Sequence, residues 1–341
     1  MKEIAQRTGL SIPTVHQVLN GYNVRFSAET KQKVIEAAKA LDYRPNIAAR
    51  GLRAKKSFLL GLQFNAVNYP LIAGFTRGFQ SVCSAESYAP IFLTHTESSE
   101  ESDNVRTLID RRVDGIVVNC AIDPDGSSNA AKFAELRTAG TPMVEVFGRF
   151  VEGAPRVTLD YHAGAVSATR LLIEKGHQRI ALFTHEDYRA SERVPGLYWT
   201  AWEHWRGYSE TMRAAGLEEL SFTYPVGQDR TREGAHYFGA YNSMGPFFAH
   251  QKRPTAVVCY RGEAAEAAVH YANANRSDAP DGFAIAVFDA FRPIVAEAIE
   301  VNVLPLPTEQ VGSAAARMLL DLIAGKPVVD IAMGPPLAVT S

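Results

Sequence analysis

Long apolar runs are absent from this chain of 341 residues. No stretch approaches the roughly 18 consecutive apolar residues that a membrane-spanning helix needs. The polar start, residues 1–7 (MKEIAQR), has no apolar segment typical of a secretory leader. We therefore expect a cytoplasmic protein that does not contact a membrane. Hydrophobic residues still make up 46% of the chain, enough for two or three domains with buried cores.

Cysteine is scarce, and the common catalytic motifs are missing. Cys83, Cys120 and Cys259 are far apart and form no CxxC pair, so we interpret them as buried thiols in a reducing compartment. The chain also lacks GxSxG, P-loop, HExxH and GxGxxG motifs and any His/Cys set with metal-ligand spacing. His177 falls at a helix-to-strand turn, where a structural role is expected. The sequence thus predicts no enzyme activity, no metal and no cofactor.

Charge is divided unevenly along the chain. Residues 1–56 hold eleven lysines and arginines against four acidic residues, whereas the remainder holds 24 against 33. A basic N-terminal segment can neutralise DNA phosphates and release their counterions, while an acidic body avoids unspecific DNA contact. The charge distribution therefore favours a nucleic-acid-binding N-terminus.

Residues 2–42 contain three short helical patterns. The first, at about 2–8, buries Ile4 and Ala5 and stops at Gly9, which suits a left-handed position after a helix. Ser11 is the expected N-cap of a second helix through about residue 20, and Ser27 caps a third. The apolar face predicted for the third helix comprises Val34, Ile35, Ala38 and Leu41. Two helices joined by a tight turn and backed by a third are typical of a helix-turn-helix domain.

From residue 58 onward, short apolar runs alternate with amphipathic helices. Such runs separated by helices indicate parallel sheets covered on both faces. Nine strands are too many for a single compact lobe. We therefore expect two doubly wound lobes whose ligand binds beyond the carboxyl ends of the strands. The predicted strands are residues 59–64, 91–94, 115–120, 143–147, 157–160, 180–184, 222–226, 256–260 and 283–288.

Particular segments resemble the LacI/GalR family along essentially the whole chain. In the N-terminal part they are residues 4–21 (IAQRTGLSIPTVHQVLNG), 28–30 (AET), 41–46 (LDYRPN) and 49–53 (ARGLR). In the rest they are residues 111–116 (RRVDGI), 164–165 (GA), 175–181 (KGHQRIA), 254–257 (PTAV) and 319–325 (LLDLIAG). A helix-turn-helix alone is a moderate indication of this family, but these segments in this order are a strong indication.

The resemblance implies an α/β protein with an all-α helix-turn-helix head and a periplasmic-binding-protein-like sensor of two doubly wound parallel-sheet lobes. The head would span residues 1–44, the hinge 45–57, and the sensor and dimerisation domain 58–341. The N-lobe would comprise about 58–158 and 308–333, and the C-lobe about 159–307 and 334–341. The implied function is a ligand-responsive repressor of sugar or sugar-acid catabolic genes that binds a near-palindromic operator as a homodimer.

The resemblance places the DNA contacts of the head on the second helix. Ser11 and Thr14 would touch phosphates, and Ile12, Pro13, His16 and Gln17 would face base edges. Asn20 is the last predicted DNA contact of the head. The family usually has Ser-Arg where this chain has His16-Gln17. Gln17 suits adenine and His16 can donate to a purine N7, so we expect an altered half-site; the alternative is that Gln17 contacts only the DNA backbone. The family's polar residue before the first helix is absent or replaced by Met1.

The hinge resembles a segment that becomes helical only on DNA. Leu52 matches the leucine that enters the minor groove and kinks the site. Gly51 would cost such a helix roughly 1 kcal/mol, which fits a segment that orders on binding. A plain polar linker is the alternative. The predicted hinge contacts are Asn46 as a cap, Ala49 for close packing, Leu52 as the wedge, and Arg50 and Arg53 near phosphates.

In the sensor, Asp289 matches the family aspartate that takes paired hydroxyls of a sugar; its alternative role is to cap the next helix. Other positions depart from the family, with Arg261 in place of Asn and His204 in place of Arg. Arg261, with Arg206 and Arg149 nearby, suggests a ligand that carries hydroxyls and a carboxylate or phosphate. The predicted effector-binding set is Phe64, Tyr69, Phe147, Arg149, Trp202, His204, Arg206, Arg261 and Asp289.

Residues 193–202 (RVPGLYWTAW) have no close counterpart in the family. The three tryptophans of the chain, Trp199, Trp202 and Trp205, gather there. Aromatic rings at this spacing either stack on a sugar or pack in a core, and both interpretations stay open. The alternative function is a two-lobed solute-binding protein without a DNA role, which would need a secretory leader and no basic head.

Overall fold

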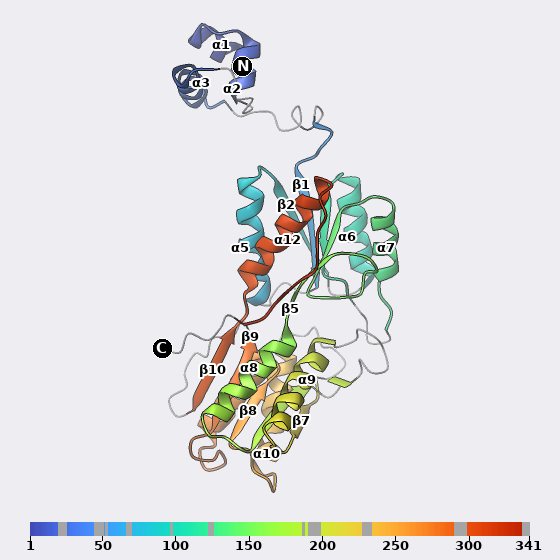
Figure 1. Cartoon of the computed structure of the whole chain (residues 1–341), viewed down its shortest axis with the longest axis vertical. Helices are drawn as coiled ribbons and strands as arrows, with labels where there is room; N and C mark the ends of the chain where they lie inside the picture. Colours follow the sequence, from blue (N-terminus) through green and yellow to red (C-terminus); the bar gives the residue numbers. More distant parts are fainter. Residues whose placement is uncertain are drawn as a thin grey trace. The chain divides into compact units, whose positions relative to one another are not determined.

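The computed structural model describes residues 1–19, 26–43, 51, 54–65, 70–95, 98–121, 126–185, 188–189, 199–226, 234–289 and 299–335. The chain divides into two compact units, Met1–Phe58 and Leu59–Ser341 (Figure 1). Residues 193–198 and most of the hinge lie outside the described residues. So do seven predicted site residues: Asn20, Asn46, Ala49, Arg50, Leu52, Arg53 and Tyr69.

The first unit contains three helices: α1 (Lys2–Thr8), α2 (Ile12–Leu19) and α3 (Ala28–Ala40). Helix α1 ends at Gly9, whose φ of 69° is left-handed as predicted. The Ser11 hydroxyl accepts a hydrogen bond from the Thr14 amide at 3.2 Å. The Ser27 hydroxyl accepts one from the Thr30 amide at the same distance. Both predicted caps and the helix-turn-helix arrangement are therefore confirmed.

A small apolar core joins these three helices. Ile4, Val15 and Val34, one from each helix, are no more than 1% exposed. The prediction that Ile35 faces this core is wrong, because its side chain is 40% exposed. Ile35 follows Val34 by one residue, which rotates it about 100° around the helix axis. Ala37 takes the buried position instead.

The second unit contains two fully parallel sheets, which confirms the predicted α/β class. In spatial order, the six-stranded sheet contains β11 (Ile331–Met333), β5 (Arg156–Leu159), β4 (Met143–Val146), β3 (Gly115–Val118), β1 (Leu59–Asn65) and β2 (Ala89–His95). The five-stranded sheet contains β10 (Glu300–Pro305), β9 (Ala284–Asp289), β8 (Ala256–Cys259), β6 (Ile180–His185) and β7 (Leu220–Tyr224). All nine predicted strands are present.

Two strands were not predicted, β10 and β11, and both lie at an edge of their sheet. No residue of either strand is buried. A central strand of a parallel sheet is covered on both faces and gives a continuous apolar run. These half-covered edge strands lack such a run, so no hydrophobic pattern indicated them.

Helices cover both faces of each sheet. The helices of the first sheet are α5 (Pro70–Ala85), α6 (Ser98–Asp110), α7 (Ala130–Thr138) and α12 (Thr308–Ile323). Those of the second are α8 (Tyr161–Glu174), α9 (Trp199–Ala214), α10 (Ala235–Phe248) and α11 (Gly262–Ala274). Successive residues of β6 alternate between two cores: Ile180 and Leu182 pack with α8 and α9, and Ala181 and Phe183 with α10 and α11.

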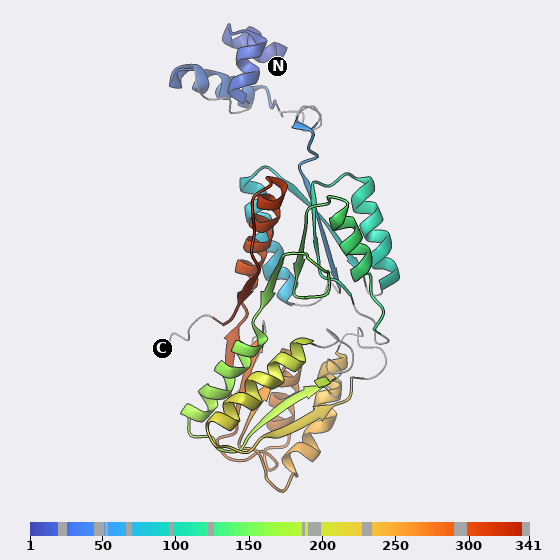
Figure 2. The ribbon, with the colours of Figure 1, turned by 45° about the vertical axis from the view of Figure 1, so that its right-hand side comes forward.

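We call the first sheet with its helices the N-lobe and the second the C-lobe. The chain passes from the N-lobe to the C-lobe between β5 and α8 and returns between β10 and α12. Helices α5 and α12 lie side by side on the N-lobe although they come from opposite ends of the sensor (Figures 1 and 2). Gly78 and Gly312 allow this approach, because a Cβ at either would meet a main-chain oxygen of the other helix.

All three cysteines are buried and free, as interpreted from the sequence. Burial raises the pKa of the Cys83 thiol to about 12 and also raises the pKa values of Cys120 and Cys259. In the described part of the chain, no helix is both long enough and apolar enough to cross a membrane.

Candidate DNA-binding face and candidate effector site

Helix α2 presents one polar face and one apolar face. Val15 and Val18 are buried against the core of the head. Ser11, Ile12, Pro13 and Gln17 are exposed, and Thr14 and His16 are half-buried. The predicted base-facing residues therefore share the side of α2 that the head does not cover. Ile12 is 43% exposed on this side of α2.

The start of α2 is held by its own side chains. The Ser11 and Thr14 hydroxyls lie 2.8 Å apart, and Ser11 also caps the Thr14 amide. Both hydroxyls therefore stand at the amino end of the helix, where the helix dipole favours negative charge. This is the place that the sequence predicted for phosphate contacts.

Three predicted effector residues come together at the carboxyl edge of the C-lobe sheet: His204, Arg261 and Asp289. Asp289 is the last residue of β9 and is only 4% exposed. Its carboxylate accepts a hydrogen bond from the amide of Gly262, the first residue of α11, at 2.6 Å. Asp289 thus caps a helix, although not the next one along the chain. Its predicted contact with sugar hydroxyls stays a prediction.

Each of the three arginines predicted to meet an acidic group has a partner within the chain. Arg261 donates two hydrogen bonds to the Glu263 carboxylate, at 3.2 and 3.4 Å. Burial of Glu263 opposes ionisation, but the charge and hydrogen bonds of Arg261 outweigh it and lower the pKa of that carboxyl. The Arg149 guanidinium lies 4.5 Å from the centre of the Trp199 ring.

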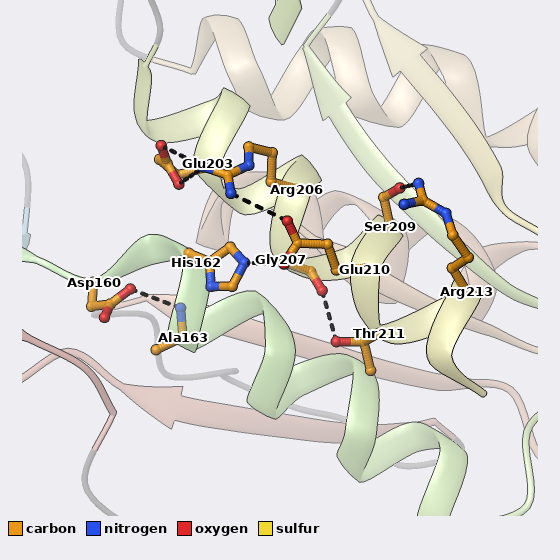
Figure 3. Close-up of polar contacts among 10 residues, drawn as sticks. All are labelled: Asp160, His162, Ala163, Glu203, Arg206, Gly207, Ser209, Glu210, Thr211 and Arg213. Carbon is orange, nitrogen blue, oxygen red and sulfur yellow. Dashed lines mark hydrogen bonds and ion pairs between the residues drawn. The ribbon is translucent and has the colours of Figure 1, made fainter.

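Arg206 belongs to a polar network on the surface of the C-lobe (Figure 3). It pairs with Glu203 at 3.2 Å and with Glu210 at 3.2 Å, both on α9. Glu210 also lies 2.7 Å from the His162 ring, and these two partners lower its pKa. Arg206 follows His204 by two residues, about 200° around the helix, so the two side chains leave α9 on opposite sides.

His204 is the most unusual residue of this edge. Its side chain is fully buried, and burial lowers its pKa to about 3, so the ring is neutral at physiological pH. Neither ring nitrogen has a hydrogen-bond partner among the described residues. The ring lies 5.6 Å from the ring of Tyr260, whose hydroxyl meets Thr200 at 2.6 Å. Buried polar groups without partners are costly and mark positions that a ligand can complete.

Sequence reasoning missed two aromatic residues at this edge, of which Tyr260 is the ring neighbour of His204. Tyr260 follows β8 directly, and His185 is the last residue of β6. Their rings lie 5.5 Å apart. Both occupy the strand-end positions where ligands bind in such sheets, so their position was the signal that could have found them.

The tryptophans of α9 divide between core and surface. Trp205 packs against the C-lobe core and stacks on the half-buried Trp202 at 4.6 Å. Trp199 is only 7% exposed and meets Tyr161 edge-on at 6.2 Å. These contacts favour the core interpretation for Trp205. They leave the predicted ligand contact of Trp202 open.

On the N-lobe side, Phe64 and Phe147 belong to an aromatic cluster. Phe64 is fully buried near the end of β1, and its ring lies 4.9 Å from Phe75 and 6.4 Å from Phe147. Phe147 is half-buried just beyond β4, with a left-handed φ of 54°. Phe147 and Arg149 therefore lie in one loop at the carboxyl edge of the N-lobe sheet.

A cavity of about 610 Å³ lies elsewhere on the N-lobe, at the amino ends of β4 and β5. Arg137, Arg156 and Asp330 are among its lining residues, and none of the predicted effector residues that the structure describes lines it. His177 lies where the sequence predicted, after α8, with its ring 3.2 Å from the Thr255 hydroxyl. That contact supports a structural role for His177.

Comparisons with known proteins agree with this architecture. Residues 1–46 match the bacterial regulatory proteins of the lacI family, and residues 169–335 match the periplasmic binding protein-like domain. The chain is 28% identical over 334 residues to the HTH-type transcriptional regulator RegA of Clostridium saccharobutylicum, covering 96% of this chain and 93% of RegA. It is 29% identical to the ribose operon repressor of Escherichia coli (strain K12), covering 75% and 72% of the two chains. The fold is similar to that of the Lac repressor bound to ONPG, with a TM-score of 0.70 at 17% identity over 98% of this chain and 97% of that one.

Proposed function

We propose that this chain, whose residues 1–46 match the bacterial regulatory proteins of the lacI family, is a ligand-responsive repressor of sugar or sugar-acid catabolic genes. The observation that carries the proposal is the exposed face of α2, where the side chains opposite the buried Val15 and Val18 are those suited to DNA. The basic composition of residues 1–56 supplies the electrostatic attraction.

Binding to DNA is tested with the full chain and the DNA that flanks its own gene. Fluorescence anisotropy should give a much tighter complex with this fragment than with a shuffled fragment of equal length. The affinity should fall steeply as salt rises, because bound phosphates release counterions. Equal affinity for both fragments would contradict the proposal. If neither fragment bound, the result would favour the alternative of a two-lobed solute-binding protein without a DNA role.

The repressor acts as a homodimer in this proposal, because two heads are needed to read a near-palindromic site. Light scattering should give twice the chain mass of 37.3 kDa. Leu52 is the proposed minor-groove wedge of each hinge. Leu52→Ala should weaken operator binding and reduce DNA bending, and an unchanged affinity and bend would rule out the wedge.

The effector of this proposal is a sugar held at the carboxyl edge of the C-lobe by Asp289 and His204. The paired states of Arg261, Arg206 and Arg149 weaken the inference to an acidic ligand, and a neutral His204 suits hydroxyl groups. The family relative named as a ribose operon repressor also supports a neutral sugar. Calorimetry against matched neutral and acidic sugars decides between them, and binding of acidic sugars alone would overturn the neutral choice.

The proposed mechanism is a shift between two closures of the lobes. An effector that binds one closure better than the other biases the ordering of the hinge and so changes operator affinity. Anisotropy titrations of the operator complex with and without the bound sugar test this coupling.

A further inference from the structure

Glu145 is a fully buried carboxylate in the middle of the N-lobe. It is the third residue of the four-residue strand β4, and no part of it is exposed. Burial raises the pKa of its carboxyl, whereas two main-chain hydrogen bonds oppose that rise. A buried acid without such partners would be strongly destabilising. Its place in the sheet therefore depends on the groups that bind it.

Those two hydrogen bonds come from the loop that follows β4. One carboxylate oxygen accepts from the Phe150 amide at 2.7 Å, and the other accepts from the Val151 amide at 3.2 Å. Glu145 thereby folds the loop back onto its own strand. The left-handed φ of Phe147, 54°, lies in the turn that this closure produces.

The same loop reaches the other lobe through Arg149. Its guanidinium lies 4.5 Å from the centre of the Trp199 ring at the start of α9. Trp199 in turn meets Tyr161, which follows the crossing from β5 to α8, with ring centres 6.2 Å apart. The loop held by Glu145 thus places a cation against an aromatic ring of the C-lobe.

We propose that Glu145 is a positioning residue that holds the loop of residues 147–151 so that Arg149 stacks on Trp199 and fixes the spacing of the two lobes at this edge. The consequence for regulation rests on the proposed function and on the effector contact that the sequence predicts for Arg149. An effector that engages Arg149 competes with Trp199 for it, so ligand binding and lobe spacing become linked.

The position of the tryptophans makes this inference measurable without DNA or effector. All three lie in α9 of the C-lobe, and the N-lobe has none. A substitution at Glu145 can therefore change tryptophan accessibility only through contacts between the lobes or through loss of the fold. Acrylamide quenching of the full chain measures the change in tryptophan accessibility, and circular dichroism shows whether the fold is lost.

The test uses Glu145→Gln, which keeps the size of the side chain but turns an N–H donor toward one of the two loop amides. We expect the population with an accessible Trp199 to rise by about two- to fivefold, as for the loss of one partly exposed cation–π contact. Arg149→Met should give the same rise, and the double variant should add nothing further. Glu152→Gln, the same change at an exposed position of this loop region, is the matched control and should leave quenching unchanged.

Three results would overturn the proposal. Unchanged quenching in Arg149→Met means that the contact does not protect Trp199 in solution. A rise in Arg149→Met but not in folded Glu145→Gln means that Glu145 does not position the loop. Any rise must also disappear in a Trp199→Phe background. If Glu145→Gln fails to fold, Glu145→Asp, which keeps the charge but shortens the reach, takes its place with the same expected rise. Because these measurements need no operator and no sugar, their failure is distinguishable from failure of the proposed function.

Discussion

Replacing the buried His204 should make the unliganded protein more stable. Both ring nitrogens lack a hydrogen-bond partner among the described residues, and the side chain has no exposed surface. An unsatisfied buried polar group costs about 1–3 kcal/mol. Leucine has nearly the same volume and no polar atom. His204→Leu should therefore raise the free energy of unfolding at pH 7 by about 1–3 kcal/mol.

The difference in free energy of unfolding between His204→Leu and the wild-type protein should grow as the pH falls. Burial lowers the pKa of His204 from 6.5 to about 3, so between these values the unfolded chain binds a proton that the folded chain does not. The wild-type protein then loses stability as the pH drops below 6.5, by about 1.4 kcal/mol for each unit. At pH 5 this loss is roughly 2 kcal/mol. His204→Leu removes this contribution, because leucine does not titrate.

Urea unfolding of the full chain, followed by circular dichroism at pH 7 and pH 5, measures both effects. The difference between His204→Leu and wild type should be larger at pH 5 by roughly 2 kcal/mol. His250→Gln, which changes an exposed histidine, should show no such difference. Equal pH dependence in wild type and His204→Leu would refute the argument. A variant less stable than wild type at pH 7 would show that the ring has partners in the folded protein.

Three further predictions concern the DNA, the core and the thiols. Gln17→Ala should leave the head folded, because the side chain is exposed. In a panel of substituted operators, it should relax the base preference at one half-site position by about 1–3 kcal/mol. An unchanged preference would mean that Gln17 contacts only the DNA backbone. Tyr208→Phe should lower the free energy of unfolding by about 1–3 kcal/mol in urea titrations, because the fully buried hydroxyl lies 2.8 Å from the Ile180 carbonyl and accepts from the Leu220 amide at 2.9 Å. The three buried cysteines should not react with a thiol reagent until the chain unfolds, so fast labelling of the native protein would contradict their raised pKa values.

The head shows how far local signals carry. Gly9, Ser11 and Ser27 predicted the ends of the three helices, because caps depend on residues within one turn. Periodicity did less well for Ile35, where two adjacent apolar residues competed for one buried face of α3. Which of the two residues is buried depends on the packing of α3 against the other two helices.

The effector site shows where local signals stop. Asp289 and Gly262 are 27 residues apart, and Arg149 and Trp199 are 50 apart, so no pattern in either neighbourhood reveals that they meet. From the sequence, Arg261 with Arg206 and Arg149 suggested a ligand that carries hydroxyls and a carboxylate or phosphate. The folded chain gives each of them a partner, which changes the chemistry that the site can offer.

The sequence by itself determined the class of this protein. Its charge distribution, helix ends and buried strand runs depend on local composition, and they are enough to specify a basic helix-turn-helix head and parallel-sheet lobes. Only the tertiary structure decided which polar groups are satisfied. It buried His204 without a described partner, paired Arg261 with Glu263, and used Glu145 to hold the loop of Arg149, because burial and pairing depend on distant segments that meet only when the sheets form.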